Sequence, residues 1–292
     1  ALSDYFGERC ITYSLKEAIC SGMLTRYYYY PVLTYLDRDE LDDYLAITAQ
    51  IAQAVRKKKG KMVFSEYAKQ LLMRRARIIA GAKGKIPELK RQMEPHINEK
   101  HLLIYCGSAT VKEDEDDEFG KRQIDLVSEM LGNDLGMRVG RFTSREDARE
   151  RVQVRDAFSS GDMLQALVAI KCLDEGVNIP NIHTAFILAS STNPKEYIQR
   201  RGRVLRKAPG KDYAVIYDFV TLPFQINEIE MQNETVINAT KGLIKRELIR
   251  MLDFAELAEN PSVTYDLVYD LKHGFRIREE ELKGEEVNSD VI

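Results

Sequence analysis

The sequence predicts an α/β fold, a mostly parallel sheet with helices on both faces and helical regions at both ends of the chain. The main basis is the segment after His101, where short apolar strands alternate with amphipathic helices. The chain has 292 residues, of which 44% are hydrophobic and 30% charged. This size and composition are typical of a soluble globular protein with one or two domains.

The start of the chain shows short strands and turns. Alternating residues favour a strand from Cys10 to Leu15, and Lys16 to Ile19 favour one helical turn that Gly22 ends. The run from Leu24 to Leu33 is rich in strand-forming residues, and Pro31 makes it an edge strand or breaks it.

Four consecutive tyrosines, from Tyr27 to Tyr30, lie in this run. Such side chains could stack on nucleobases. On a strand, however, successive side chains point to opposite faces, so at most half of the tyrosines would line one surface. We therefore favour packing over base stacking.

Basic helices follow the tyrosine run. Helical spacing of apolar residues predicts a helix from Arg38 to Lys59, with Asp39 as its N-cap. Two more helices are expected at Ser65 to Ala80 and at Ile86 to Met93. The arginines of the first of these could reach phosphate, but a solvated helix face is the commoner explanation: Arg74, Arg75 and Arg77.

The alternating segment begins after His101. Its expected elements are strands at 101–106, 137–142, 164–170, 183–189 and 213–219, and helices at 119–131, 144–158 and 193–204. Ligands bind such sheets at the carboxyl ends of the strands, where the loops after Ile170 and Ala189 lie. Beyond Pro223 the pattern is helical again, at 226–257 and 263–268, and the last dozen residues are expected to fray.

Several classes of protein do not fit the sequence. The four cysteines form no CxxC pair and have no nearby histidine set, which argues against a disulfide framework or a zinc site. No apolar run approaches the length of a membrane span, and no signal segment is visible, so we expect a cytoplasmic protein without a membrane partner. The chain begins with Ala1, which hints at a cut or processed start.

Two loops look suited to phosphate, LDEGVNIP at 173–180 and QRRGRVLR at 199–206. On a helix Gln199, Arg203 and Arg206 share one face. The apolar neighbours of these residues predict that the helix is packed and that its guanidinium groups are held in fixed directions, toward a phosphate. The alternative is a solvated basic helix. Guanidinium is planar, permanently charged and rich in donors, which suits it to phosphate.

The rest of a nucleotide site is not visible. None of the Gly-Lys pairs belongs to a Walker A loop. Two acidic runs, at 39–42 and 114–117, imitate the acidic box of a helicase, but neither follows a buried apolar strand. A helix N-terminus and a solvated loop are the better interpretations.

These motifs resemble those of superfamily 2 helicases. LVAIKCLDEGVNIP and YIQRRGRVLR look like motifs V and VI, while HLLIYC and GRFTS resemble motifs IV and IVa. The resemblance covers about residues 100–221 and implies a RecA-like second motor domain of the restriction and repair translocase branch. It divides the chain into linker strands and basic helices (1–98), the RecA-like domain (99–222) and a helical extension (223–292).

The resemblance also implies roles for individual residues. Arg203 and Arg206 would act as arginine fingers on the γ-phosphate of ATP, which binds together with Mg²⁺ to an N-terminal lobe missing from this chain. Gln199 and Arg200 would lie at the boundary between the lobes. Gly176 and Asn178 would approach the nucleotide, although the family usually has Asp where Asn178 stands.

Nucleic-acid contacts are implied at the same edge of the sheet. The resemblance places Ile170 and Lys171 at the nucleic-acid backbone, and four further residues with suitable hydroxyl or backbone donors follow neighbouring strands: Gly107, Ser108, Thr143 and Ser144. Ser144 is an equally good helix N-cap. We favour DNA over RNA as the partner, but the sequence distinguishes them little because both present the same phosphates. The oligomeric state is open.

The function expected from the resemblance is that of the C-terminal motor domain of an ATP-dependent helicase or translocase. Without its partner lobe the fragment should be inactive. The alternative is a catalytically silent module that binds nucleic acid or serves as a scaffold.

Overall fold

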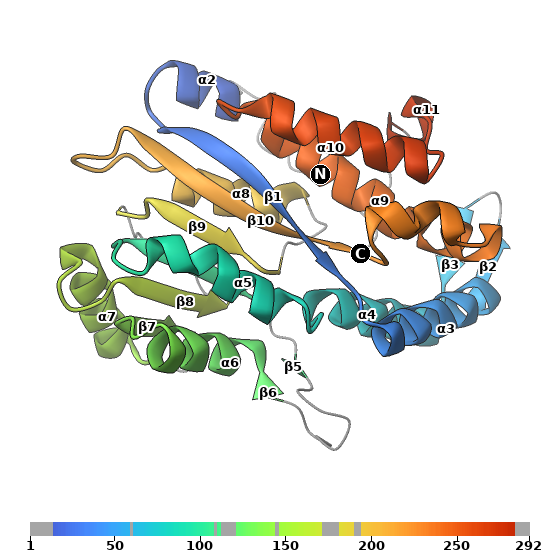
Figure 1. Ribbon diagram of the computed structural model, residues 1–292, viewed down its shortest axis with the longest axis horizontal. Coiled ribbons are helices and arrows are strands. Elements are labelled where there is room, and N and C mark those ends of the chain that lie inside the picture. The colour runs from blue at the N-terminus through green and yellow to red at the C-terminus, as the bar shows by residue number, and fades with distance from the viewer. Residues whose placement is uncertain are drawn as a thin grey trace, which may run out of the picture.

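The computed structural model describes residues 14–58, 61–107, 110–111, 121–143, 146–170, 181–189 and 194–283. Its centre is a six-stranded sheet in the order β1-β10-β9-β4-β8-β7, and every strand pair in it is parallel (Figure 1). The strands are β1 (Arg26–Tyr35), β4 (Leu102–Cys106), β7 (Val139–Phe142), β8 (Ala166–Ile170), β9 (Thr184–Ile187) and β10 (Tyr213–Leu222). The predicted α/β fold is confirmed.

Helices cover both faces of the sheet. One face packs against α7 (Ala148–Ser160), α8 (Pro194–Val204) and α9 (Glu234–Ala255). The opposite face packs against α5 (Lys85–Met93) and α6 (Gln123–Glu129), which a π-helical turn, η2 (Met130–Asp134), extends. The buried strands are apolar on both sides, as expected for a parallel sheet between two helical layers.

Helical flanks complete the fold. The remaining elements are α2 (Leu15–Cys20), α3 (Arg38–Ala54), β2 (Val55–Lys58), β3 (Lys61–Phe64), α4 (Glu66–Ala80), η1 (Glu94–His96), β5 (Thr110–Val111), β6 (Lys121–Arg122), η4 (Ile226–Met231), α10 (Pro261–Gly274) and α11 (Glu279–Lys283). α9, α10 and α11 share an apolar cluster with the end of β10.

β1 is an edge strand, as Pro31 predicts, and it runs unbroken beside β10 for ten residues. Proline is tolerated there because a strand at the edge has one side without a partner strand. The Asn260 amide covers part of that side: Tyr29 N donates to Asn260 Oδ1 at 2.8 Å and Asn260 Nδ2 donates to Tyr29 O at 3.0 Å. These bonds blunt the exposed edge.

The tyrosines of β1 pack, as favoured from the sequence. Tyr27 and Tyr29 are fully buried, and their hydroxyls donate to Phe254 O at 2.6 Å and to Asp218 Oδ2 at 3.0 Å. On the other face Tyr30 stacks on Tyr217, with 5.4 Å between ring centroids. The run therefore attaches β1 to α9 on one side and to β10 on the other.

A buried ionic network joins α9 to the sheet. Arg250 donates to Asp218 Oδ2 at 2.9 Å and to Glu247 Oε2 at 2.5 Å, and all three side chains are at most 5% exposed. Burial raises the pKa of Glu247, although the adjacent Arg250 opposes this. The desolvation cost of burying each charge is offset by its oppositely charged partners.

Two helix starts differ from their predictions. α3 has Asp37 as its N-cap and not Asp39, and α7 has Asp147 as its N-cap and not Ser144. Both aspartates form a capping box with the glutamate three residues on, which satisfies two backbone N–H groups at once. Asp39 lies in the first turn of α3, so the acidic run there is a helix N-terminus, while the run at 114–117 lies outside the described residues.

Two element types near the start are also corrected. The helix predicted to reach Lys59 ends at Ala54, where β-branched Val55 begins a hairpin in which β2 pairs antiparallel with β3. Leu15, predicted as the end of a strand, begins α2, because Ser14 and Glu17 form a capping box. The rest of that predicted strand, up to residue 13, lies outside the described residues.

Candidate functional site

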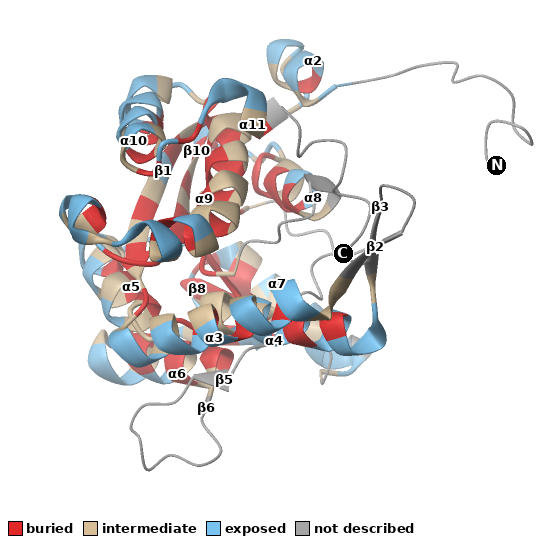
Figure 2. Cartoon of the chain, turned by 90° about the vertical axis from the view of Figure 1, so that its right-hand side faces the viewer, coloured by how far each residue is buried: buried red, intermediate tan, exposed pale blue. Residues whose placement is uncertain are grey.

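Arg200, Arg201 and Arg203 lie on α8, which has a buried and an exposed side (Figure 2). Arg206, predicted to share a helix face with Gln199 and Arg203, lies beyond the helix, because α8 ends at Val204 and Arg206 forms an isolated antiparallel bridge with Leu24. Tyr197, Val204 and Leu205 are buried against the sheet, as expected, whereas Ile198 is 39% exposed. Gln199 is exposed, Arg203 and Arg206 are half-buried, and Arg200 and Arg201 are buried. The arginines of this segment therefore divide into two sets.

Arg200 holds α8 against the sheet. Its guanidinium lies 5.5 Å from the centre of the Tyr105 ring on β4, and its Nη1 donates to Ala189 O at 2.9 Å. Glu196, one turn earlier, pairs with it at 3.5 Å. Arg200 thus contacts the ends of two central strands from within the domain.

Arg201 binds the C-terminal extension. Its Nη2 lies 2.8 Å from Asp253 Oδ2, its Nη1 donates to Asp253 O at 2.8 Å, and its guanidinium lies 4.7 Å from the Phe254 ring centre. The Oδ2 contact is an ion pair without hydrogen-bond geometry, because this oxygen has no hydrogen-bond partner among the described residues. Burial raises the pKa of Asp253, and Arg201 opposes that shift.

Arg203 and Arg206 form a like-charged pair on the less buried side. Burial lowers the pKa of Arg206, and the positive charge of Arg203 lowers it further. Guanidinium is planar, permanently charged and rich in donors, so both side chains are chemically suited to bind a phosphate.

The end of α8 is fixed by Lys211, which the sequence did not single out. The Lys211 ammonium is buried and donates to Val204 O at 2.5 Å and to Arg206 O at 2.9 Å. Burial lowers its pKa to about 8. Lys211 therefore satisfies carbonyl groups that the end of the helix leaves without a partner, and it fixes the backbone of Arg206.

Gly107 lies at the carboxyl end of β4, in a tight position. Its N–H donates to Gln123 Oε1 at 2.7 Å, and a Cβ at this position would lie 3.0 Å from the Ala189 Cβ. The Gln123 amide is fully buried and donates in turn to Ala80 O at 2.9 Å. Gly107 is thus bridged to the end of α4 through a glutamine that the sequence did not indicate.

Thr143 already binds a carboxylate of this chain. Its N–H donates to Glu146 Oε2 at 2.5 Å and its hydroxyl donates to Glu146 Oε1 at 3.0 Å. Both donors proposed for phosphate are therefore directed at an anionic group. Ile170, half-buried, ends β8 next to β4 and β7.

Five predicted site residues lie outside the described residues: Ser108, Ser144, Lys171, Gly176 and Asn178. The structure brings the others to α8 and to the carboxyl edge of the sheet. Among the described residues no group of three or more His, Cys, Asp or Glu could hold a metal ion. In the same part of the chain no helix is long and apolar enough to cross a membrane.

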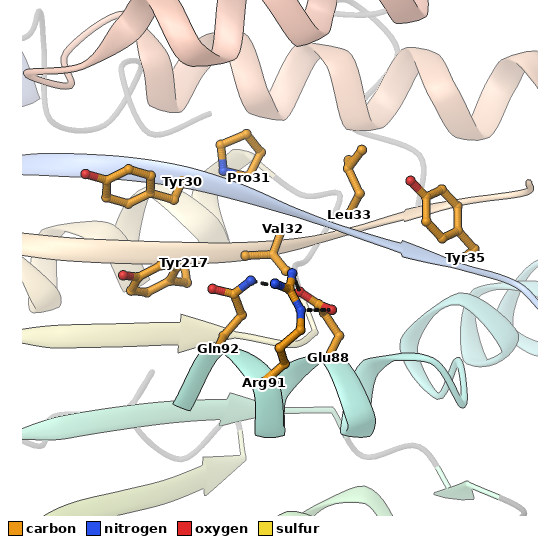
Figure 3. Close-up of a pocket in the computed structure, with 9 residues that line it drawn as sticks. All are labelled: Tyr30, Pro31, Val32, Leu33, Tyr35, Glu88, Arg91, Gln92 and Tyr217. Atoms are coloured by element: carbon orange, nitrogen blue, oxygen red, sulfur yellow. Dashed lines mark hydrogen bonds and ion pairs between the residues drawn. The ribbon is translucent and has the colours of Figure 1, made fainter. Parts of the chain in front are cut away.

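A hollow of about 440 Å³ lies elsewhere, between β1 and α5 (Figure 3). It is lined by Tyr30, Pro31, Val32, Leu33, Tyr35, Glu88, Arg91, Gln92 and Tyr217. Arg91 and Gln92 both bind Glu88, so the polar groups at its floor are paired with one another. None of the predicted contact residues lines this hollow.

Residues 84–208 match the family "Helicase conserved C-terminal domain". This region is a superfamily 2 helicase C-terminal domain. The match includes β4, β8, β9 and α8 with the arginines described above, and helicases of this family use ATP.

Two curated relatives are similar to parts of the chain. The chain is 23% identical over 142 residues to Dicer-like protein 2-2 of Aspergillus niger, which is 47% of this chain and 10% of that protein. It is 30% identical over 79 residues to the DNA 3'-5' translocase XPB2 of Sulfurisphaera tokodaii, which is 27% of this chain and 17% of that protein. The chain thus spans only a small part of the length of these relatives.

The SWI2/SNF2 ATPase core of Sulfolobus solfataricus, solved in complex with double-stranded DNA, is a structural neighbour. The similarity covers 80% of this chain and 50% of the other, with 13% identity and a TM-score of 0.48. At this score the similarity adds nothing to the assignment.

Proposed function

We propose that the chain is the C-terminal motor domain of an ATP-dependent nucleic-acid helicase or translocase, and that Arg203 and Arg206 bind the γ-phosphate of ATP held by a separate N-terminal lobe. The observation that supports this proposal is the match of residues 84–208 to the helicase C-terminal domain, which includes the half-buried Arg203 near the end of α8 and the half-buried Arg206 just after it. Guanidinium groups are suited to phosphate because they are planar, permanently charged and rich in donors.

In this proposal the chain supplies charge and position. ATP and Mg²⁺ supply the reactive phosphate and its counter-ion, and the missing lobe holds both. Arg203 and Arg206 stabilise negative charge on the phosphate, a contribution of roughly 10³-fold or more in related phosphoryl transfer. Gln199 lies at the boundary between the lobes. Arg200 lies at the same boundary and keeps α8 in place there through its contacts with Tyr105 and Ala189.

The remaining predicted contacts belong to the same proposal. Gly176 and Asn178 approach the nucleotide. The nucleic-acid backbone, of DNA rather than RNA, is contacted by six residues at or just after the carboxyl ends of strands: Gly107, Ser108, Thr143, Ser144, Ile170 and Lys171. We also propose a cytoplasmic location.

ATP hydrolysis by the natural gene product tests the proposal. We expect hydrolysis that nucleic acid stimulates, and we expect the gene to encode a GxxxxGKS or GxxxxGKT loop and an acidic box upstream of Ala1. The isolated 292-residue chain should not hydrolyse ATP. A natural protein without these motifs would favour the second candidate, a catalytically silent module that binds nucleic acid.

A further inference from the structure

Arg206 lies just outside a helix, and its backbone is held there by two other parts of the chain. α8 ends at Val204, so the regular hydrogen bonds of a helix interior do not fix Arg206. Its own N–H makes only a long bond, of 3.4 Å, to Arg203 O. The direction of the Arg206 side chain therefore depends on the contacts that hold the residues after α8.

The first contact comes from the segment that leads into β1. Leu24 forms an isolated antiparallel bridge with Arg206, and Thr25 N donates to Leu205 O at 2.8 Å. This segment is itself anchored, because Leu24 N donates to Ala18 O of α2 at 2.9 Å and β1 follows directly. One side of the Arg206 backbone is thus paired with a fixed extended segment.

The second contact is the Lys211 side chain, which reaches Arg206 from within the fold. Its Nζ donates to Val204 O at 2.5 Å and to Arg206 O at 2.9 Å. An ammonium has three donors, so one group can join several carbonyls at a single point. Lys211 therefore connects the last residue of α8 with Arg206.

A tight turn brings Lys211 back to the end of α8. Lys211 N donates to Ala208 O at 3.2 Å, and Pro209 and Gly210 occupy the two positions between them. Gly210 has a φ of +74°. Proline followed by a glycine in the left-handed region is the pattern of a type II turn. A Cβ at Gly210 would meet no atom within 4 Å, so glycine is needed there for its conformation and not for space.

The Lys211 charge is buried without a carboxylate to compensate it among the described residues. Its side chain is buried, and burial is what lowers its pKa. Burying an ammonium costs free energy, which an apolar side chain at this position would avoid. The hydrogen bonds that offset this cost go to the backbone around Arg206.

We propose that Lys211 is a positioning residue for Arg206: with the Leu24–Thr25 segment it holds the residues after α8 so that the Arg206 guanidinium points at the γ-phosphate of ATP. The proposal rests on the proposed function, which gives the phosphate contact to Arg206. Lys211 itself touches neither ATP nor nucleic acid. Misplacing a group at a reaction centre by about 1 Å can reduce the rate by about 10²-fold.

ATP hydrolysis by the natural full-length protein, with saturating nucleic acid, tests the proposal. Lys211→Met removes the three donors and keeps a long flexible side chain. We expect kcat to fall by about 10- to 100-fold, while KM for ATP changes by less than about threefold. Lys207→Met is the matched control, because Lys207 is exposed in the same connection, and it should keep the wild-type kcat. Thermal unfolding checks that each variant folds.

A double-mutant cycle separates positioning from a general structural role. If Lys211 acts through Arg206, its removal has no further effect in the Arg206→Ala background. We expect Arg206→Ala and Arg206→Ala/Lys211→Met to hydrolyse ATP at the same rate, measured in single turnovers with enzyme in excess. A further loss of about tenfold in the double variant would give Lys211 a role apart from Arg206 and overturn the inference.

A second variant keeps Lys211 and strains only the turn that carries it. Gly210→Ala places a Cβ in open space at φ +74°, and Gly136→Ala does the same at φ +64° in a distant loop. We expect kcat of Gly210→Ala to be at least about threefold below that of Gly136→Ala. If Lys211→Met does not fold, this pair decides, and equal kcat values would contradict the inference.

Failure of this inference can be told from failure of the proposed function. A folded Lys211→Met protein with the kcat of Lys207→Met would overturn the inference, and an inactive Arg206→Ala protein would then leave the proposed function intact. An Arg206→Ala protein with wild-type turnover would overturn both.

Discussion

Arg201 of α8 forms a 2.8 Å ion pair with Asp253 of α9, and the same guanidinium lies 4.7 Å from the Phe254 ring centre. The C-terminal extension is therefore attached directly to the helix that carries Arg203 and that ends two residues before Arg206. Tyr27 of the edge strand β1 also contacts this junction, because its hydroxyl donates to Phe254 O. The position of the candidate arginines thus depends on residues that lie 50 or so positions later in the chain.

Asp253→Asn should weaken this junction. The substitution removes the charge that compensates Arg201, whose side chain is 3% exposed. We expect the free energy of unfolding to fall by about 1–3 kcal/mol in urea denaturation. Exposed Glu256 provides the matched control, and Glu256→Gln should change stability by less than about 0.5 kcal/mol. Equal stability of the two variants would show that the ion pair does not hold α8.

Arg250→Leu should be more damaging, because it leaves Asp218 and Glu247 as buried charges without their partner. We expect a loss of about 3–5 kcal/mol in the same measurement. Arg26→Leu breaks an exposed pair with Glu259, 3.8 Å apart, and should cost less than about 1 kcal/mol. A small effect of Arg250→Leu would mean that water or a rearrangement reaches the network.

Glu146→Gln should strengthen nucleic-acid binding if Thr143 contacts phosphate. The Glu146 carboxylate occupies the N–H and hydroxyl of Thr143 and repels an approaching phosphate, whereas the neutral amide repels it less. We expect the dissociation constant for duplex DNA at low salt to fall several-fold. Glu150→Gln, at the exposed capping box of α7, gives the matched charge change. Unchanged affinity would remove Thr143 from the proposed contacts.

Lys211 should make stability depend on alkaline pH. Its pKa is about 8 in the folded chain and about 10.5 when unfolded, so between these values the unfolded state binds more protons. The free energy of unfolding of the wild type should therefore rise with pH from 8 to 10.5, relative to Lys211→Met, by at most about 3 kcal/mol. Below pH 8 the difference between the two proteins should be constant. A difference that does not change across this window would show that the ammonium is not buried in solution.

The sheet could be predicted because its signals are local. Apolar strands alternate with amphipathic helices, and Pro31 marks β1 as an edge strand. The partner of that strand could not be predicted, because Arg26 pairs with Tyr213, which lies far along the chain. Nothing near the tyrosine run indicates β10 or the covering amide of Asn260.

The site could be predicted only in part, for the same reason. Helical spacing predicts that Arg203 and Arg206 share one face, but α8 ends before Arg206. Arg201 has the same sequence surroundings and is buried. Its burial depends on Asp253, which no short motif connects with it. Gln123 and Lys211 were missed because their partners are backbone groups, which leave no signal in the sequence. The two misplaced N-caps could have been found, since Asp37 and Asp147 each precede a glutamate by three residues.

The central claim is that Arg206 binds the phosphate of ATP, and steady-state hydrolysis by the natural full-length protein tests it most directly. With saturating nucleic acid, Arg206→Ala should reduce turnover by roughly 10³-fold or more, while Arg26→Ala should leave it unchanged. Thermal unfolding of both variants should match that of the wild type. An Arg206→Ala protein that folds and retains turnover within about tenfold of the wild type would contradict the account.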